Sequence, residues 1–509
     1  MTSNTKKNRI TALLAAALLA SALVSCGETA SSGAENTAAL PEGNGETQTV
    51  TEEGNGRTPV GLSPDLDFGG AEFHSAALEW QGFRYYFFAD EDNGEVMNTA
   101  IYERTMEVEE TLNVDLTHEF FKSSTTLEVP DAIVETVLAG EDRYQHALVH
   151  CIGGVAMLSS GGYLYNLDLL PNIDMTAEWW NQKQMDTLRL GKNTYYAVND
   201  YLLPTPYILY FSKALVEQYD MEDPYQLVYD GKWTLDAFAS MCKTVVKDLN
   251  GDGKMAFTDD CYAISCNEGS KYGSFAPGCD QFITEKDPQT GLRLICNTEK
   301  MVHICEVFAE LANMKATYIP QGSEYDLSVQ LTIDTGRLLF QMGDLSQCEQ
   351  FRDYTVEFGF LPYPKYDEAQ DGYHSLDWGG LLCIPTTITN PEMVGAVTEL
   401  LAYVSGDTVV PTYYDTVLTG KLTRDEDARK MLDIIFDTIC YDVGSNYFSY
   451  DASNGGWQSP FTKLFQAVYN LSVAGKQADY ASFYAKNEAG AMKSIGNFFA
   501  ALDAAEAES

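Results

Sequence analysis

Positive charge is scarce in this chain. Its 509 residues include 74 Asp and Glu but only 32 Lys and Arg, so the formal net charge at pH 7 is −42. A surface of this charge repels phosphate backbones and anionic lipid head groups. The composition therefore argues against nucleic acid as a partner.

The common catalytic signatures are also absent. The sequence has no GxSxG nucleophile elbow, no GxxxxGK[ST] phosphate loop and no HExxH zinc motif. His146 and His150 are four residues apart, but "HALVH" is typical of a strand and has no Glu between them, which favours structural histidines over a zinc site. A carboxylate pair at glycosidase spacing can arise anywhere among 74 acids. An enzyme therefore stays an alternative without a motif to support it.

The cysteines are not spaced for redox chemistry or metal binding. No two of the eleven form a CxxC pair, and most lie in apolar runs such as "LLCIP" and "RLICN". An exported chain permits disulfides, yet small buried thiols are the favoured interpretation. The ten beyond the N-terminal region are Cys151, Cys242, Cys261, Cys266, Cys279, Cys296, Cys305, Cys348, Cys383 and Cys440.

The N-terminal hydrophobic run, residues 10–25, has 16 residues and is short for a membrane span. It follows Lys6, Lys7 and Arg9, which predicts a secretory signal. Its end, "LVSC", resembles the lipobox of bacterial lipoproteins. That resemblance implies removal of residues 1–25, lipidation of Cys26 and a place at the outer face of the bacterial cytoplasmic membrane. The alternative is an ordinary signal peptide with a chance cysteine.

Residues 26–61 are rich in Gly, Ser, Thr, Glu and Asn and have one Arg and no Lys. Such a segment buries too little apolar surface to offset the entropy lost on ordering. We expect a flexible acidic tether between the anchor and a folded part.

The rest of the chain has the composition of a large globular protein, with 45% hydrophobic and 12% aromatic residues overall. The patterns predict strands over 71–78, 113–121 and 145–154, separated by helices over 98–113, capped by Asn98, and 129–140. This order predicts a mostly parallel sheet covered by helices on both faces. Ligands of such sheets bind at the carboxyl ends of the strands.

The segment "DLNGDGKMAFTDD" has the spacing of a twelve-residue calcium loop. Its ligand positions 1, 3, 5, 7 and 12 are filled by Asp248, Asn250, Asp252, Lys254 through its carbonyl, and Asp259, and Gly253 takes the turn at position 6. A helix capped by Thr234 precedes the loop, but a strand over 261–266 follows it, so the second helix of a sensor is missing. Ala256 at position 9 offers no side-chain ligand, which suggests an affinity of roughly 10⁻⁴ to 10⁻³ M. A structural calcium site is expected; a polar turn without metal is the alternative.

Aromatic residues gather where the alternating pattern breaks: at Trp80, Trp179, Trp180, Trp378, Trp457 and within 199–211. Flat aromatic faces stack on the apolar faces of sugar rings, and Asp or Asn binds the hydroxyls. A binding cleft and ordinary core packing both fit these aromatic residues. Position at strand ends favours Trp80, Asp200, Tyr201 and Trp378 as ligand-binding residues.

The chain is similar to the extracellular solute-binding lipoproteins of bacterial ABC importers, in the family that includes carbohydrate binders. The similarity extends over most of 62–500 and rests on the order of several segments, among them "EDNGEVMNTAIYERTMEVEETLNV", "LYNLDLLPNIDMTAEWWN", "NTYYAVNDYLLPTPYILYFSKALVEQY", "GKWTLDAFASMCKTV", "GRLLFQMGDLSQ", "VEFGFLPYPK" and "WGGLLCIPTTITNPEMVGAVTELLAYVSG". It implies a two-lobed α/β fold of the periplasmic-binding-protein type II, with hinged, discontinuous lobes.

The resemblance implies a first lobe of residues 62–168 and 376–410, a second lobe of 169–375 and 411–503, and a tail of 504–509. The family's sugar-stacking aromatic falls at Phe211, followed by Ser212 in place of an Asn. Its cleft turn falls at Gly343 and Asp344, with Leu345 in place of the usual aromatic.

The function implied is a monomeric, lipid-anchored receptor that captures a solute and delivers it to the transmembrane subunits of an ABC permease. The resemblance favours a carbohydrate as that solute. The alternatives are a secreted carbohydrate-active enzyme and a calcium-stabilised adhesion or scaffold protein. Turnover of a glycan would favour the first alternative, and a protein partner without a small-molecule ligand would favour the second.

Overall fold

The computed structural model describes residues 60–79, 87–122, 125–265, 269–318, 332–348, 351, 354–417, 426–473 and 479–508. The segment from Thr58 to Ser509 is one compact unit. The predicted signal, Cys26, nearly all of the tether and Trp80 lie outside the described residues, so those predictions stand as predictions.

The first sheet has the order β12-β3-β1-β2. It consists of β1 (Ala71–Leu78), β2 (Val114–Phe121), β3 (His146–His150) and β12 (Gly380–Cys383). β1 runs parallel to both β2 and β3, whereas β12, which comes from much later in the chain, runs antiparallel to β3. The predicted parallel strands over 71–78, 113–121 and 145–154 are therefore confirmed within a few residues.

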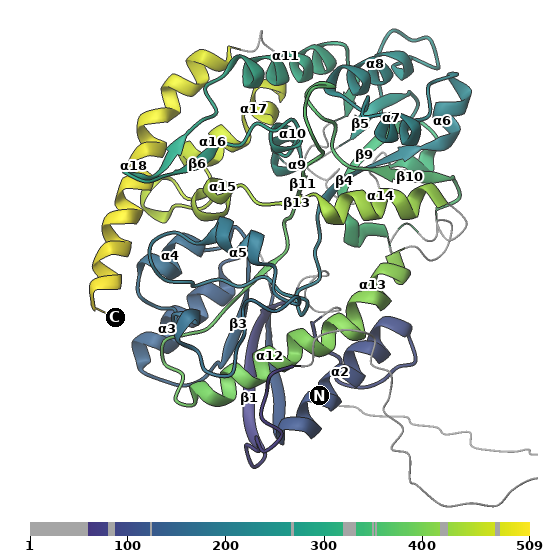
Figure 1. Cartoon of the computed structure of the whole chain (residues 1–509). Helices are drawn as coiled ribbons and strands as arrows, with labels where there is room; N and C mark the ends of the chain where they lie inside the picture. Colours follow the sequence, from purple (N-terminus) through teal and green to yellow (C-terminus); the bar gives the residue numbers. More distant parts are fainter. Residues whose placement is uncertain are drawn as a thin grey trace, which may run out of the picture. The chain divides into compact units, whose positions relative to one another are not determined.

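The second sheet has the order β10-β4-β9-β5-β8. Its strands are β4 (Tyr207–Ser212), β5 (Tyr262–Ser265), β8 (Thr317–Tyr318), β9 (Leu338–Asp344) and β10 (Phe358–Leu361). Two small pairs, β6 (Thr284–Asp287) with β7 (Gly291–Leu294) and β11 (Ser375–Leu376) with β13 (Ile439–Cys440), complete the described strands. Figure 1 shows the two sheets in separate groups of helices, which are the two lobes of the unit.

Helices surround both sheets. The helices that precede β4 in the chain are α2 (Val96–Leu112), α3 (Glu128–Ala139), α4 (Val155–Ser160) and α5 (Gln182–Leu188). The middle of the chain supplies α6 (Lys213–Gln218), α7 (Pro224–Tyr229), α8 (Leu235–Val245), α9 (Gly269–Gly273), α10 (Phe275–Gly278) and α11 (Glu299–Asn313). The last part supplies α12 (Pro391–Asp407), α13 (Val409–Val417), α14 (Glu426–Asp437), α15 (Val443–Phe448), α16 (Pro460–Phe465), α17 (Ala467–Val473) and α18 (Tyr480–Glu508).

Local sequence explains where these helices begin and end. The Thr234 hydroxyl accepts a hydrogen bond from the Ala237 amide and caps α8, as predicted. Gly140 ends α3 with φ of +70°, a left-handed conformation that favours glycine. The predicted cap of α2 at Asn98 is wrong: the helix begins at Val96, and the Asn98 side chain accepts from the Asn93 amide in the preceding turn. The Asn98 side-chain oxygen is used in this turn and therefore does not cap the helix.

The predicted boundary between the lobes at residue 169 is corrected by the packing of the next 30 residues. Trp179 and Trp180 are buried with Leu148 and Leu382 in the core of the first lobe. Their indole nitrogens donate to the two oxygens of Glu399 on α12, at 3.0 and 2.9 Å. The chain crosses to the second sheet only after about residue 203, because two indoles and a buried carboxylate hold the preceding segment on α12.

Gly395 on α12 shows how closely the backbone of residues 170–171 approaches this helix. A Cβ at Gly395 would lie 1.7 Å from the Pro171 carbonyl oxygen. Any larger residue would push the 170–171 backbone off the helix. The missing side chain thus permits the contact that places the segment on the first lobe.

Two further boundaries differ from the prediction. α13, placed in the second lobe from residue 411, contacts α2 of the first lobe as well as Leu345–Cys348 of the second. The predicted tail at 504–509 continues α18 to Glu508, and the Glu506 carboxylate accepts hydrogen bonds from the amides of Lys192 and Asn193. In Figure 1, α18 runs along one side of both lobes.

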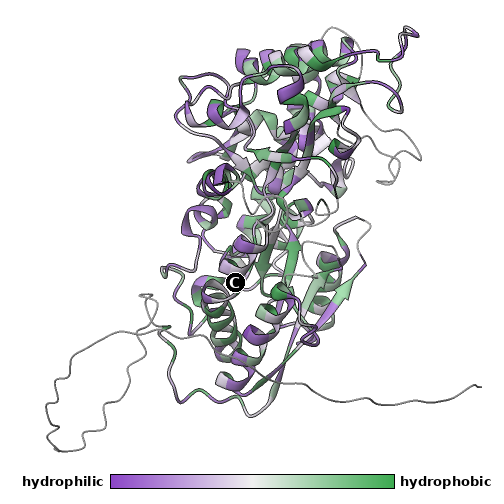
Figure 2. Cartoon of the chain, turned by 90° about the vertical axis from the view of Figure 1, so that its right-hand side faces the viewer, coloured by the Kyte–Doolittle hydropathy of each residue, from purple (hydrophilic) through white to green (hydrophobic). Residues whose placement is uncertain are grey.

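Hydropathy follows burial in this arrangement. Every residue of β4 is buried, as are the first six of β9, and Figure 2 shows the strands inside the unit as mostly hydrophobic. The outer helices alternate hydrophobic and hydrophilic residues in the same view. Within the described residues, no single helix is long and apolar enough to cross a membrane; α12 and part of α13, bent by 42°, pass that test only as a pair.

The described cysteines agree with the prediction of buried thiols. Nine are free, and all of these except the half-buried Cys440 are buried. Cys266 lies outside the described residues.

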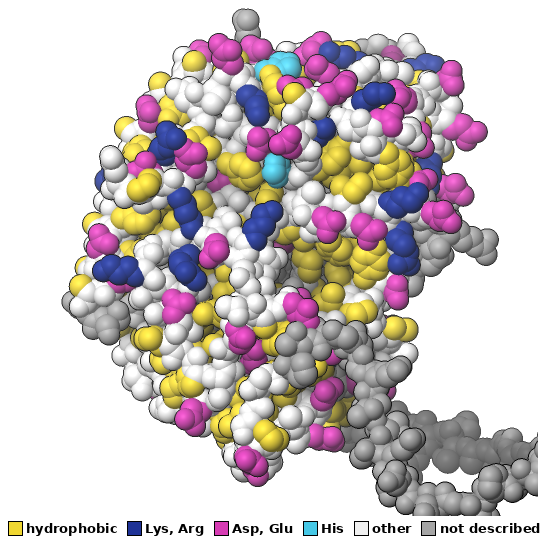
Figure 3. Space-filling model, viewed as in Figure 1, with side chains coloured by type: hydrophobic (Ala, Val, Ile, Leu, Met, Phe, Trp, Pro, Cys, Tyr) yellow, Lys and Arg dark blue, Asp and Glu magenta, His cyan; other side chains and the backbone are white. Residues whose placement is uncertain are grey.

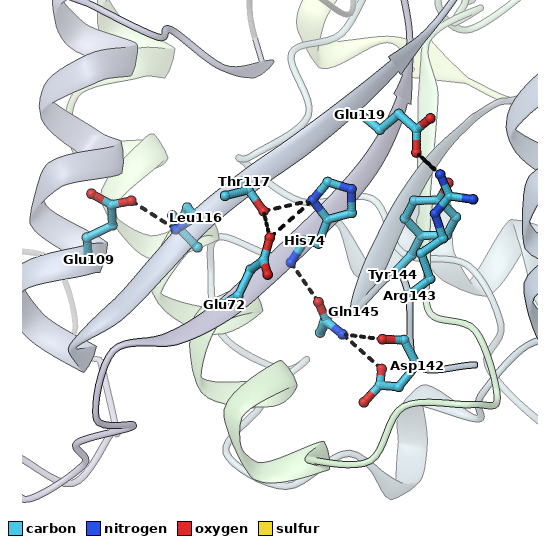
Figure 4. A network of polar contacts seen from close by, with 10 residues as sticks. All are labelled: Glu72, His74, Glu109, Leu116, Thr117, Glu119, Asp142, Arg143, Tyr144 and Gln145. Carbon is cyan, nitrogen blue, oxygen red and sulfur yellow. Dashed lines mark hydrogen bonds and ion pairs between the residues drawn. The ribbon is translucent and has the colours of Figure 1, made fainter. Parts of the chain in front are cut away.

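Polar contacts join β1, β2 and the turn before β3 in the first sheet (Figure 4). His74 Nδ1 lies 2.7 Å from the Thr117 hydroxyl, which donates to Glu72 at 2.9 Å. The His74 ring stacks on Tyr144, whose hydroxyl donates to Glu119 at 2.7 Å. Each residue drawn makes at least one of these contacts, and the contacts join neighbouring strands and turns, so this network is structural in character.

Candidate ligand-binding site between the lobes

The carboxyl ends of strands from both sheets meet around Trp378, which lies on the segment between β11 and β12. β3 ends at His150, whose ring meets the Trp378 ring edge-on at 6.0 Å. β4 begins at Tyr207, opposite the end of β9. The centroid of the Tyr207 ring lies 5.3 Å from the centroid of the Trp378 ring. Trp378 therefore occupies the position that the strand-end rule assigns to a ligand.

The Trp378 ring forms one half of a flat aromatic stack. Phe465, at the end of α16, lies 5.6 Å away between centroids with an interplanar angle of 11°. The Trp378 side chain is 8% exposed. Since Trp378 belongs to a crossing segment and Phe465 to the second lobe's C-terminal helices, a relative movement of the lobes changes the spacing of this stack.

Polar groups border the stack from the second lobe. The Ser270 hydroxyl lies 3.3 Å from that of Tyr207, and the ammonium of Lys271 lies 5.9 Å from the Tyr207 ring centroid. Both residues belong to α9, the first described element after β5. A hydroxyl, a phenol and a buried cation beside an aromatic plane are groups that bind sugar hydroxyls.

A hydrogen bond joins the two lobes next to this cluster. Asn446 on α15 donates through Nδ2 to the carbonyl of Cys151, directly after β3, at 3.2 Å. Asn446 is 1% exposed, and its Oδ1 has no partner among the described residues. A buried acceptor without a donor is unfavourable, so Oδ1 is suited to accept from a ligand hydroxyl.

Burial sets the charge state of the ionisable groups here. Burial lowers the pKa of His150 to about 3, so its imidazole is neutral near pH 7. Asp377 accepts from the Thr205 amide and the Tyr441 hydroxyl, both at 2.8 Å, and burial raises the pKa of its carboxyl group. Asp377 thus ties three segments of the junction together.

A hollow of about 230 Å³ lies further along the junction, between α4 of the first lobe and the 448–453 segment that follows α15. Phe448, Tyr450 and Phe498 supply aromatic lining, and Asp451 and Asn497 supply polar lining. Asp451 also accepts from the Ser494 hydroxyl at 2.5 Å. Aromatic and polar groups therefore continue beyond the Trp378 stack.

Two of the predicted ligand residues, Asp200 and Tyr201, are adjacent in sequence, but their side chains lie in different surroundings. Asp200 lines another hollow, next to the crossing segments. Tyr201 is 5% exposed and points into the first lobe's core, where its ring contacts Phe87 at 5.0 Å and His146 at 5.7 Å. The Arg104 guanidinium lies 4.6 Å above the Tyr201 ring. Tyr201 is a core residue here, not a ligand-facing one.

Phe211 is also placed in the core. It is 1% exposed and packs edge-on against Tyr225 at 5.2 Å, on β4, which lies between β10 and β9 in the second sheet. Phe211 lies on the same face of β4 as Tyr207, but four residues further along the strand, which is roughly 13 Å from the end that faces the junction. The structure therefore does not bring Phe211 to the Trp378 cluster.

Gly343 and Asp344 end β9 opposite Ile208 and Tyr207, at the edge of the second sheet that faces the junction. A Cβ at Gly343 would lie 2.2 Å from Gln347 Oε1 and 2.7 Å from the Tyr210 ring. The Asp344 carboxylate accepts from the Ser346 amide at 3.2 Å. Both residues shape the turn after β9.

Several residues of the cluster were missed from the sequence: Tyr207, Ser270, Lys271, Asn446 and Phe465. Tyr207 lies inside the aromatic-rich 199–211 segment, so strand-end position could have selected it instead of Phe211. Nothing in the local sequence around Asn446 or Phe465 indicates that α15 and α16 return to the junction.

The predicted calcium loop forms a tight turn in which side chains bond to their own backbone. Asp248 accepts from the amides of Gly251 and Gly253 at 2.6 and 2.7 Å, and Asn250 accepts from Asp252 at 2.9 Å. Among the described residues, no group of three His, Cys, Asp or Glu side chains is placed to hold a metal. His146 and His150 accordingly form no metal group in that part of the chain.

Comparison with known proteins identifies this architecture. No family model matches the chain, and no curated protein matches it in sequence. The galacto-N-biose- and lacto-N-biose I-binding protein of an ABC transporter from Bifidobacterium longum superimposes with a TM-score of 0.58 at 12% identity, covering 84% of this chain and 98% of that one. The chain has the fold of the solute-binding proteins of ABC transporters.

Two more solute-binding proteins show the same likeness. An ABC substrate-binding protein from Listeria monocytogenes in complex with cycloalternan gives a TM-score of 0.53 at 11% identity, covering 85% of this chain and 99% of that one. The maltotriose-binding protein of Thermus thermophilus gives 0.52 at 12% identity, covering 83% and 100%. The predicted two-lobed α/β fold of the periplasmic-binding-protein type is confirmed.

Proposed function

We propose that the chain is an extracellular solute receptor that captures a carbohydrate between its lobes and presents it to an ABC permease. The observation that supports this most directly is the Trp378 stack, which lies between strand ends of both lobes and beside the polar groups of Ser270, Lys271 and Asn446. Aromatic planes with hydroxyl, amide and cationic groups around them suit a sugar ring. The solved proteins of similar fold bind sugars according to their descriptions.

In this proposal the lobes open and separate Phe465 from Trp378, and a sugar ring then stacks on the exposed indole. Hydroxyls of the sugar bond to Asn446 Oδ1 and the α9 groups, and these contacts exist only when the lobes are close. The ligand therefore stabilises the closed arrangement by its differential affinity. No covalent step is needed. Lipidation of Cys26 and the tether of residues 26–61 would keep the receptor beside its permease.

A thermal-shift screen of the purified full chain against mono- and oligosaccharides, amino acids and peptides tests the proposal. A ligand at 100 times its Kd adds about 2.7 kcal/mol to the free energy of unfolding, which corresponds to an increase of about 3 °C in Tm for a unit of this size. We expect an increase with a sugar that is recovered unchanged. Consumption of the sugar would favour a carbohydrate-active enzyme, and silence of every compound would favour a scaffold that binds protein.

We also propose that Ca²⁺ binds the 248–259 loop and stabilises it. Three side-chain oxygens alternate along the turn, and Gly251 and Gly253 take positive φ of 73° and 77° that let the backbone fold around them. At 10 mM Ca²⁺ we expect Tm to rise by about 1.5 to 3 °C above its value in chelator, given a Kd of roughly 10⁻⁴ to 10⁻³ M.

The Asp248→Asn variant should lose most of this calcium effect. Asp287→Asn is the matched control, because Asp287 also accepts amide bonds in an exposed turn, from Gln289 and Thr290, without the calcium spacing. An equal response of both variants to chelator would contradict the loop as the calcium site.

A further inference from the structure

Most of α18 packs on the second lobe, at the side of the junction that lies away from α13 (Figure 1). Its partners there are α11, α16, α17 and β7. A Cβ at Gly490 would lie 2.5 Å from Pro460 Cγ on α16. A Cβ at Gly291, the first residue of β7, would lie 2.2 Å from the Phe499 ring. Such close approaches fix this length of α18 to the second lobe.

The last turns of α18 contact the first lobe instead. Leu502 is fully buried, and its Cδ2 would lie 2.8 Å from a Cβ at Gly191. The Glu506 carboxylate accepts from the amides of Lys192 and Asn193 at 3.0 and 3.2 Å. This turn belongs to the first lobe, because the segment that follows it pairs with β12 of the first sheet. One helix therefore joins the two lobes.

The 191–193 turn is shaped to receive a carboxylate. Gly191 has a φ of +85°, a conformation that favours glycine, and the next two amides face the same acceptor. A glutamate near the C-terminus of a helix is otherwise unfavourable, because the negative end of the helix dipole lies there. The contact with the first lobe, and not the helix itself, accounts for an acidic residue at position 506.

α18 also closes its side of the junction. It supplies Asn497 and Phe498 to the wall of the hollow of about 230 Å³ that lies between α4 and the 448–453 segment. Tyr447, whose ring lies 5.2 Å from that of Phe498, donates to the Leu188 carbonyl of the first lobe at 2.7 Å. On the face drawn in Figure 3, the junction is hollowed beside α13 and α14, where hydrophobic side chains gather, whereas side chains fill it on the α18 side.

We propose that residues 502–506 of α18 are a clasp, which holds the lobes closed in the absence of solute and sets the ratio of closed to open chain. Opening about the crossing segments leaves α18 on the second lobe, where most of its contacts are. Leu502 and Glu506 must then leave the 191–193 turn. Because these contacts exist only while the lobes are close, they stabilise the closed arrangement alone.

The distance between the lobes in the solute-free full chain tests the clasp. Leu138, 74% exposed on α3, and Met314, 40% exposed after α11, are positions for spin labels on the two lobes. Labels attached through p-acetylphenylalanine avoid the native thiols, and double electron–electron resonance measures their separation. We expect wild type to populate mainly the distance of the present structure. A wild-type chain that shows only a longer distance overturns the proposal.

Two variants weaken the clasp separately. Glu506→Ala removes the acceptor of two amides, and Leu502→Ala removes the buried side chain. Each should lower the ratio of closed to open chain about tenfold or more, and the double variant about 100-fold or more, so that the longer distance becomes populated. Circular dichroism confirms that each variant is folded. An unchanged distance distribution in the double variant overturns the proposal.

Glu488→Ala is the matched control. Glu488 has the same charge on the same helix but accepts from the Tyr484 hydroxyl, one turn away, at 3.0 Å. Its replacement should leave the ratio of closed to open chain unchanged. A shift equal to that of Glu506→Ala would show a general effect of charge and would overturn the clasp.

The clasp also regulates capture of the solute, an expectation that rests on the proposed function. Because a solute bridges closed lobes, the double variant should bind the sugar found in the screen more weakly, by the factor by which the closed fraction falls. A screen without any sugar contradicts the proposed function, while the distances of the solute-free chain still decide on the clasp. Sugar binding with unchanged distances in the double variant contradicts the clasp alone.

Discussion

Replacing Trp378 by alanine should weaken capture of the solute by about 100-fold or more and lower the free energy of unfolding by about 3 to 5 kcal/mol. The first effect follows from loss of the stacking plane at the point where strands of both lobes end. The second follows from the cavity left beside Phe465, Tyr207 and His150, because the indole is only 8% exposed. Calorimetric titration with the sugar found in the screen, and urea unfolding, measure the two effects.

Two controls separate binding from stability. Trp378→Phe keeps a flat ring and should restore most of the stability, with a smaller loss of affinity. Trp457→Ala removes an indole that contacts Tyr450 at 5.0 Å, outside the cluster, and should leave affinity unchanged. Equal loss of affinity in the two alanine variants would contradict the Trp378 site and return the aromatic residues to a packing role.

The regular part of the first lobe could be predicted from sequence because its signals are local. "AEFHSAAL" is a strand over its full length, and Gly140 ends a helix where a left-handed residue is required. These features depend on residues within one or two turns of each other. Pairing of β12 with β3 joins residues more than 200 positions apart, and no pattern in either strand specifies it.

The site residues show the same limit. Asp200 and Tyr201 are neighbours, yet one lines a hollow and the other packs under Arg104. Both lie in the turn closed by the hydrogen bond from the Leu202 amide to the Asn199 carbonyl, and their side chains leave that turn in different directions. Phe211 and Tyr207 share one face of β4, so the choice between them depended on which end of the strand meets the other lobe, and the sequence does not give this. The lobe boundary was misplaced because the partner of Trp179 and Trp180 is Glu399, on a helix some 220 positions later.

Acid should destabilise the protein through His146, in the core of the first lobe. Its ring lies 4.9 Å from Phe73 and 6.0 Å from Phe87, and neither ring nitrogen has a hydrogen-bond partner among the described residues. Burial first, and the nearby Arg104 charge second, lower the pKa of His146 to about 3. The unfolded chain, with a histidine pKa of about 6.5, binds the proton more readily than the folded one.

The stability contributed by neutral His146 is therefore complete above pH 6.5 and is lost as the pH falls toward 3, by about 1.4 kcal/mol per pH unit. His150, whose pKa burial also lowers to about 3, adds a loss of the same sign. Asp442 opposes both, because burial raises its pKa to about 6 and its neutral form stabilises the fold as the pH falls below that value. The difference in the pH dependence of unfolding free energy between wild type and a His146 variant isolates the contribution of His146.

His146→Leu removes the titrating ring and keeps an apolar side chain of similar volume. At pH 7 we expect the free energy of unfolding to change by less than about 1.5 kcal/mol. Between pH 6.5 and 4.5 the variant should be spared about 2.3 kcal/mol of the loss of stability seen in wild type. Urea unfolding at several pH values measures this. Leu148→Ala, two residues along the same strand and also buried, should lower stability equally at every pH. If His146→Leu instead keeps the full wild-type pH slope, the neutral buried imidazole is not the acid-sensitive group of this lobe.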